Sequence, residues 1–360
     1  DLDAIQNRYS FEQATEILTN QPSISTSMHF DSFKVSEFLK KIAKERGVIH
    51  TQTLVQDFEL NEQGNVVKII SEDGEFPTDL VIDASGFARV LIGKKFKSKW
   101  QSFSEYLWLD QAIPFHLNHH GKNPELVTRA TAMNAGWMWQ IPLKERIGAG
   151  YVFSSEFITE QQVIDEIQQY FGEEIEPQKT IKFEPGYFEE VWQNNVMALG
   201  LASGFVEPLE ATSIGQMLEQ IRMFIKVIQR SGAIVSDTVI KQFNEANAQS
   251  WLGIRDFLRM HYDTPRRDTP FWQKVAETPY PESYANLKEV MMQRMPRMQD
   301  IEGYATFGWN GIFHVVNWIF VAQALGLISP EACRNELSML SKSDQENIMC
   351  YINQFKPRMQ

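Results

Sequence analysis

The stretch from residue 200 to residue 217, GLASGFVEPLEATSIGQM, brings together side chains that could do chemistry. Glu207 and Glu210 are three residues apart, and Thr212 and Ser213 follow where a helical apolar pattern begins. The start of a helix leaves backbone N–H groups unpaired and partly positive, so it attracts an anion. A carboxylate beside such an anion has a raised pKa, which makes it useful for proton transfer. The stretch predicts either this site or two ordinary acids that stabilise a helix start.

Two further stretches contain residues that suit a ligand site. In GWMWQIPL, Trp137 and Trp139 alternate with Met138, so in a strand both indoles lie on one face. Such a pair forms an aromatic wall, either of a core or of a binding site. In DLVIDASGF, an apolar strand ends in Asp-x-Ser-Gly, a pattern that is common where a sheet edge meets a nucleotide.

The elements that must position these residues change in type along the chain. The spacing predicts a helix over 31–47, a hairpin around the turn NEQG, and a strand in TDLVIDASGF that is buried on both faces. Segments from 106 to 200 are rich in strands, and one helix, TEQQVIDEIQQYFG, interrupts them. From Ser213 onward helical spacing dominates. We therefore expect an α/β (α+β) fold, with a sheet module over 1–235 and a helical module over 236–360.

Composition excludes several classes of partner. The net charge of -12, with no block of Lys or Arg, argues against nucleic acid and anionic membranes. No apolar run reaches the length of about 18 residues that a membrane span needs. Cys333 and Cys350 are the only cysteines, which suits a reducing cytoplasm and provides neither a disulfide framework nor a metal site. The first residues, DLDAIQNRYS, lack the apolar core of a signal peptide, so a cytoplasmic protein is expected.

The order of these motifs resembles a known family. DASGF, GWxWxIP, GLASGFxEPLEATSI and RDFLRMHY…RRDTPFW follow one another as in the flavin-dependent halogenases of the tryptophan halogenase family. The signature of that family is W-x-W-x-I-P, formed here by Trp137, Trp139, Ile141 and Pro142. The resemblance implies an FAD-dependent monooxygenase-like sheet module with a C-terminal helical substrate module.

The resemblance also implies a reaction. In such enzymes a separate flavin reductase, a transient partner, supplies reduced FAD, and oxygen and a chloride or bromide ion then give hypohalous acid. That oxidant passes through an internal tunnel to a lysine and attacks an electron-rich aromatic ring, here expected to be a small indole or phenol.

Residue roles follow from the positions that match the family motifs. Glu210 stands at the position of the catalytic glutamate, and Thr212 and Ser213 stand at the halide site. Trp137 and Trp139 would lie near the flavin and hinder its use as a simple monooxygenase. The positions that match flavin contacts are Val55, Leu201 and Ile214.

Three positions depart from the family pattern. Ala211 replaces the serine that follows the catalytic glutamate, and Ser213 replaces the glycine of tryptophan-specific members. Arg267 stands where enzymes for free tryptophan carry an acid that holds the substrate ammonium. Phe271 and Trp272 remain as a pair that can stack on a substrate ring. We therefore expect free tryptophan to be a poor substrate. Separately, His261 and Tyr262 of RDFLRMHY are expected only to pack between the modules.

One family motif does not occur. The chain has no G-x-G-x-x-G for the FAD pyrophosphate, and its earliest lysines, from Lys34 on, lie downstream of the family's catalytic lysine. A chain without the family's first third is expected, with weak FAD binding and exposed apolar faces that favour association, for example as a homodimer. The alternatives are a flavin hydroxylase of the same fold and an inactive truncated member that serves as a binding module.

Overall fold

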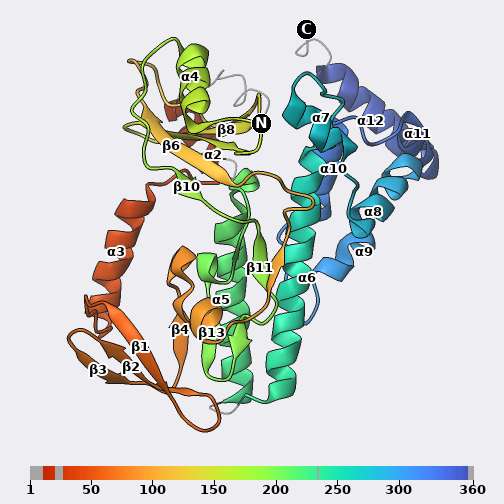
Figure 1. Ribbon diagram of the computed structural model, residues 1–360. Coiled ribbons are helices and arrows are strands. Elements are labelled where there is room, and N and C mark those ends of the chain that lie inside the picture. Colours follow the sequence, from red (N-terminus) through yellow and green to blue (C-terminus); the bar gives the residue numbers. More distant parts are fainter. Residues whose placement is uncertain (1–10, 21–26, 233–234, 356–360) are drawn as a thin grey trace.

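The computed structural model describes residues 11–20, 27–232 and 235–355 (Figure 1). Over these ranges small sheets combine with long helices, which confirms the expected mixed α/β fold class. The helices that follow residue 236 gather on one side of the molecule (Figure 1). The division into modules at residue 235 stays a prediction.

The strands of the described ranges form four sheets, of order β1-β2-β3, β10-β6-β9-β8-β7, β14-β11-β5 and β12-β13-β4. Their bounds are β1 Val55–Leu60, β2 Val66–Ser71, β3 Gly74–Pro77, β4 Val81–Asp83, β5 Trp100–Ser102, β6 Gln111–Leu117, β7 Arg129–Met133, β8 Gly136–Pro142, β9 Ile147–Phe153, β10 Ile181–Lys182, β11 Gly186–Phe188, β12 Trp192–Gln193, β13 Val196–Ala198 and β14 Gly204–Phe205.

The α-helices are α2 Phe11–Asn20, α3 Ser32–Glu45, α4 Glu160–Phe171, α5 Thr212–Ser231, α6 Asp237–His261, α7 Pro270–Glu277, α8 Glu282–Gln293, α9 Met298–Ile301, α10 Val315–Ala324, α11 Pro330–Met339 and α12 Lys342–Phe355. Shorter helical turns are η1 Gly86–Ala88, η2 Val90–Lys95, η3 Gly200–Ala202, η4 Leu209–Ala211 and η5 Glu302–Tyr304. In the described part of the chain, no helix is both long and apolar enough to cross a membrane.

The N-terminal elements match the predicted pattern with one correction. The Asp31 carboxylate accepts from the first amides of α3, and β1 and β2 form the hairpin around NEQG. No residue of α3 is buried, and Phe33 and Phe38 are 80% and 61% exposed. β4 pairs in parallel with β13 at the edge of its sheet, and Ile82 at its centre is 38% exposed. The prediction that this strand is buried on both faces was therefore wrong.

The five-stranded sheet separates two cores because neighbouring side chains of a strand point to opposite faces. Met138 in β8 packs with Val163 and Ile167 of α4 on one face. Trp137 lies on the other face, in the larger core that includes α6. α4 begins at a capping box formed by Thr159 and ends at a left-handed glycine, as its sequence predicts.

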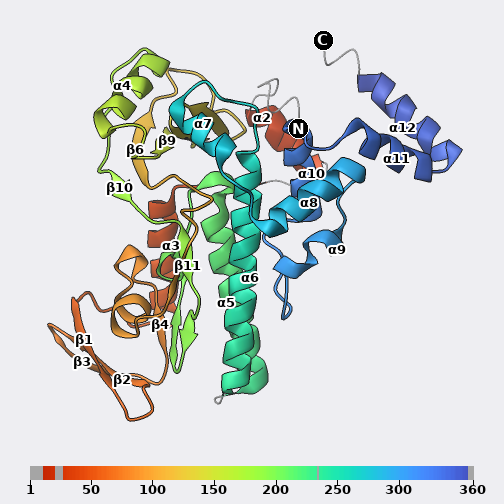
Figure 2. The same cartoon turned by 45° about the vertical axis from the view of Figure 1, so that its right-hand side comes forward.

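The helices α5 and α6 lie side by side (Figures 1 and 2). Part of their buried contact is polar: the side-chain amides of Gln216 and Gln220 donate to Asn247 Oδ1 at 3.1 and 2.9 Å. The apolar positions that predicted α5 include Ile214 and Leu218, which are 46% and 57% exposed. The spacing thus found the helix but not the face that it buries.

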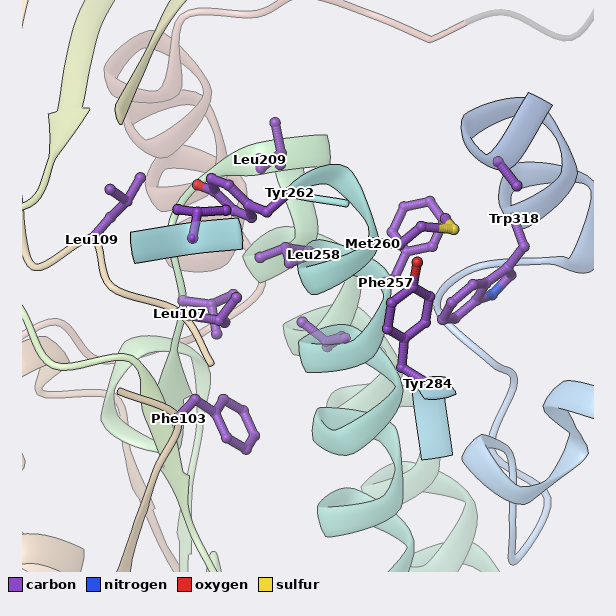
Figure 3. Packing of buried hydrophobic residues seen from close by; sticks show 14 of the residues in the cluster. Phe103, Leu107, Leu109, Leu209, Phe257, Leu258, Met260, Tyr262, Tyr284 and Trp318 are labelled. Carbon is purple, nitrogen blue, oxygen red and sulfur yellow. The ribbon is translucent and has the colours of Figure 1, made fainter. Parts of the chain in front are cut away.

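The larger core fixes the C-terminal end of α6. It joins Leu107 and Leu109, Leu209 of η4, and Phe257 and Tyr262 at the end of α6 (Figure 3). Full burial of a large apolar side chain contributes about 1.5–3 kcal/mol. This packing therefore holds the end of α6 beside the turn that carries Glu207 and Glu210.

Candidate active site

The turn between β14 and α5 has a strained backbone. Glu210 and Ala211 adopt left-handed conformations, with φ values of 60° and 51°, although neither is a glycine. Each such residue costs about 1–2 kcal/mol. The surrounding packing must maintain this turn, and strain of this kind concentrates at functional sites.

Glu210 is half-exposed and lies beside a histidine. Its carboxylate oxygen Oε1 is 3.4 Å from Nε2 of His261, and its side chain is 47% exposed. The hydrogen bond with His261 lowers the pKa of the Glu210 carboxyl, against the opposing effect of partial burial. Glu210 is therefore ionised over a wide pH range.

Glu207 has a different environment. It is 1% exposed, and its Oε2 accepts from the indole N–H of Trp137 at 2.5 Å and from the hydroxyl of Tyr262. Burial raises the pKa of the Glu207 carboxyl to about 7, although these two hydrogen bonds act in the opposite direction. Its other oxygen, Oε1, has no partner among the described residues. The sequence predicted a carboxyl whose pKa is raised by a neighbouring anion. In the structure the carboxyl with the raised pKa is that of Glu207, and the cause is burial.

The start of α5 lies next to Glu210. The N-cap position is Ala211, so no side chain caps the first amides of the helix. Thr212 is buried and its hydroxyl donates to the carbonyl of Leu209 at 2.9 Å. The hydroxyl of Ser213 is buried and has no partner among the described residues. An anion at this helix start would meet both a partly positive end and an unused donor.

Trp137 and Trp139 lie on one face of β8, as their alternation predicts. Their ring centroids are 6.1 Å apart, and both pack on the larger core. Ile141 and Pro142 complete the strand, and the carbonyl of Pro142 accepts from Nδ1 of His29 at 2.9 Å.

Gly150 in β9 makes room for Trp139. A Cβ atom at Gly150 would lie 2.1 Å from two carbons of the Trp139 indole. We expect Gly150→Ala to displace this ring and to lower the free energy of unfolding by about 1–3 kcal/mol, as measured by urea denaturation and near-UV circular dichroism. The control is Gly148→Ala in the same strand, where the nearest atom would be 3.5 Å away. Equal losses in both variants would contradict this role.

The residues predicted to contact substrate divide into two groups. Phe271 and Trp272 are buried in α7, 0% and 4% exposed, and both pack against Tyr262. The indole N–H of Trp272 donates to the carbonyl of Met133 at 2.8 Å. Arg267 is exposed, and its guanidinium donates to nearby backbone carbonyls. The structure therefore brings the aromatic pair, but not Arg267, to the ring that contacts Glu207.

The positions predicted to contact flavin are accessible. Leu201 in η3 and Ile214 in α5 lie on adjoining elements, and Ile214 is 46% exposed. Val55 begins β1, at the far end of α3 from the five-stranded sheet, and is 41% exposed (Figure 1). The structure thus places Leu201 and Ile214 near the turn, whereas Val55 lies away from it in the sheet formed by β1, β2 and β3.

Two residues that were expected only to pack belong to the site. His261 contacts Glu210, and Tyr262 contacts Glu207, across 51 and 55 residues of sequence. The available signal was the position of the His-Tyr pair at the end of a helix in the motif RDFLRMHY, which says nothing of its partners.

Other candidate sites contain none of the predicted residues. A cavity of about 800 Å³ lies beside β6 and the segment after α4, and its lining includes His116, Arg146 and Gln178. Among the residues that the structure describes, no group of three or more His, Cys, Asp or Glu side chains is arranged to hold a metal ion.

Comparison with known proteins gives consistent matches. The family model described as tryptophan halogenase matches residues 2–341. The uncharacterised protein y4xG of Sinorhizobium fredii is 39% identical over 98% of this chain and 70% of its own length. Tryptophan 7-halogenase RebH of Lentzea aerocolonigenes is 33% identical over 69% of this chain and 48% of its own. The structure of BrvH, a flavin-dependent halogenase from Brevundimonas sp. BAL3, matches with a TM-score of 0.78 at 28% identity, over 89% of this chain and 64% of that one.

These matches bear on two predictions. The chain spans about half of RebH and nearly two thirds of BrvH. The prediction of a missing first third is not borne out by the family match, which begins at residue 2. The motif-based family prediction is confirmed: the chain belongs to the tryptophan halogenase family.

Proposed function

We propose that the protein catalyses flavin-dependent halogenation of an electron-rich aromatic compound of the indole or phenol type. The observation that carries this proposal is the strained turn, which holds an ionised, half-exposed Glu210 beside the uncapped start of α5. The chain is similar to RebH, which is named as a tryptophan 7-halogenase, and to BrvH, which is named as a flavin-dependent halogenase.

The residues around the turn fit a flavin and a halide. The unpartnered hydroxyl of Ser213 and the first amides of α5 would hold the halide, and the accessible side chains of Leu201 and Ile214 would contact the flavin. Bound as FADH2, the flavin would give two electrons to O2, and the halide would give two more as it becomes hypohalous acid, with the second oxygen atom leaving as water. A separate flavin reductase would provide the FADH2, in the cytoplasm.

Glu210 would act on the aromatic ring. When halogen bonds to a ring carbon, the hydrogen on that carbon leaves as a proton and its electron pair restores aromaticity. The carboxylate of Glu210 accepts this proton, and it is ready to do so because His261 keeps its pKa low. The half-exposed side chain then returns the proton to solvent.

The nature of the reaction is tested by product analysis with and without bromide. We expect a brominated product only when bromide is present. A hydroxylated product under both conditions would favour a flavin hydroxylase of the same fold. Flavin absorbance that remains after FAD is added and excess is removed separates either enzyme from a non-catalytic binding module. Gel filtration of the same sample tests for the homodimer.

Free tryptophan is expected to be a poor substrate. Arg267 supplies a positive charge near α7, where it would repel a substrate ammonium while Phe271 and Trp272 pack beside the site. Kinetics with tryptophan, indole and phenols should therefore give the lowest kcat/KM for tryptophan. Arg267→Glu should raise that value about threefold to tenfold, the size of an exposed charge interaction. A screen in which tryptophan reacted fastest would contradict this prediction.

A further inference from the structure

His261 has a defined proton arrangement. Its Nδ1 lies 2.9 Å from the backbone carbonyl of Phe257. A carbonyl oxygen can only accept, so Nδ1 must carry a proton. In a neutral ring of this tautomer Nε2 has no proton, yet Nε2 is the atom that faces Oε1 of Glu210. Two acceptors make an unfavourable contact, so a proton lies between them.

The surroundings favour placing this proton on the histidine. His261 is the last residue of α6, and the C-terminal end of a helix is partly negative. The carboxylate of Glu210 faces the ring directly, and the buried Glu207 is close enough for His261 to act on its pKa, in opposition to the dominant effect of burial. Two neighbouring titratable groups have other partners: Tyr262 hydrogen-bonds to Glu207, and the Arg259 guanidinium packs over the rings of Trp108 and Tyr280.

The imidazole ring is also fixed in place. It meets the ring of Phe257 edge to face at 5.1 Å, and Phe257 stacks on Phe313 at 3.7 Å. Phe257 belongs to the core at the end of α6 (Figure 3). The histidine side chain is 17% exposed, so solvent reaches it without mobilising it.

We propose that His261, in its imidazolium form, is the positioning residue that holds Glu210 ionised and turned toward the substrate. This inference rests on the proposed function and adds a residue to it. Oε1 of Glu210 is engaged by Nε2–H of His261, which leaves the second carboxylate oxygen to receive the ring proton. When Glu210 takes up that proton it loses its ion pair with His261, and release to solvent restores the pair.

The test separates this role from a structural one. We expect His261→Gln, which keeps a neutral donor near Oε1, to move the acid limb of the pH–rate profile to higher pH, because the charged partner that lowers the pKa of Glu210 is lost. The loss of turnover should then be severalfold larger at pH 5 than at pH 8. A uniform loss at all pH values would overturn the proposal, because a packing defect does not depend on the ionisation of Glu210.

A second measurement does not require halogenation. The Glu210 carboxyl can be titrated by carbon NMR in protein labelled at the glutamate side chains, with its signal assigned from Glu210→Gln. The midpoint should rise in His261→Gln. The matched control is His314→Gln, since His314 caps the start of α10 and has no contact with Glu210. An unchanged midpoint of Glu210 in His261→Gln would refute the inference, even if halogenation is confirmed. A raised midpoint in a protein that does not halogenate would support the His261–Glu210 pair and overturn the proposed function.

Discussion

Glu210→Gln should lower halogenation by about 100- to 10,000-fold, the range over which a positioned general base acts. The amide has the size of the carboxylate and tolerates the same left-handed backbone, so the turn should persist. It cannot accept the proton that leaves the ring, and it carries no charge to stabilise the cationic ring. Steady-state turnover measures the loss, and flavin absorbance of the purified protein shows that binding is retained.

The control for this variant is Glu62→Gln, which removes a carboxylate from the exposed β1–β2 turn. It should retain the turnover of the unmodified protein. If Glu210→Gln kept more than about a tenth of the original turnover, proton acceptance by Glu210 would be excluded.

Local periodicity predicted the elements that carry the site. The alternation of Trp137 and Trp139 is a property of any strand, and the structure has both rings on one face of β8. The helix start at Thr212 and the hairpin around NEQG were likewise predicted, since turn residues and apolar spacing act over a few neighbours. These features need no knowledge of distant contacts.

The buried face of α5 shows where such patterns stop. Ile214 and Leu218 are exposed, whereas Gln216 and Gln220 are buried. Both amides donate to Asn247 Oδ1 on α6, which offsets part of the cost of burying them. Hydrogen bonds of this kind depend on which helix packs alongside, and apolar spacing contains no information about that.

The two glutamates show the same limit at the site itself. Nothing in VEPLEAT distinguishes their environments, yet Glu207 is 1% exposed and the side chain of Glu210 is 47% exposed. The difference comes from Trp137 and Tyr262, which lie 70 and 55 residues away in sequence and donate to Glu207 alone. Motif resemblance could assign Glu210 a role, but only tertiary contacts reveal that the neighbouring acid has the raised pKa.

That raised pKa makes stability depend on pH. Burial raises the pKa of Glu207 to about 7, from an ordinary value of 4.5. Between these values the folded protein keeps the proton that the unfolded chain has lost, so the free energy of unfolding falls as pH rises. The full effect is on the order of 3 kcal/mol, since one pKa unit corresponds to about 1.4 kcal/mol. This loss of stability should be complete near pH 8 and absent below about pH 4.5.

Glu207→Gln should remove this dependence. The glutamine carbonyl can accept from Trp137 and Tyr262 as the carboxyl oxygen does, and the amide does not titrate. Relative to the unmodified protein, the variant should therefore gain about 2.5 kcal/mol between pH 5 and pH 8, as measured by urea denaturation at each pH. Taking the difference between the two proteins cancels the titration of the other groups, and Glu62→Gln should show no such gain. A stability difference between Glu207→Gln and the unmodified protein that stayed constant across this range would mean that Glu207 is ionised in the folded state at pH 5. Its contacts with the indole and the phenol would then outweigh the cost of burying its charge.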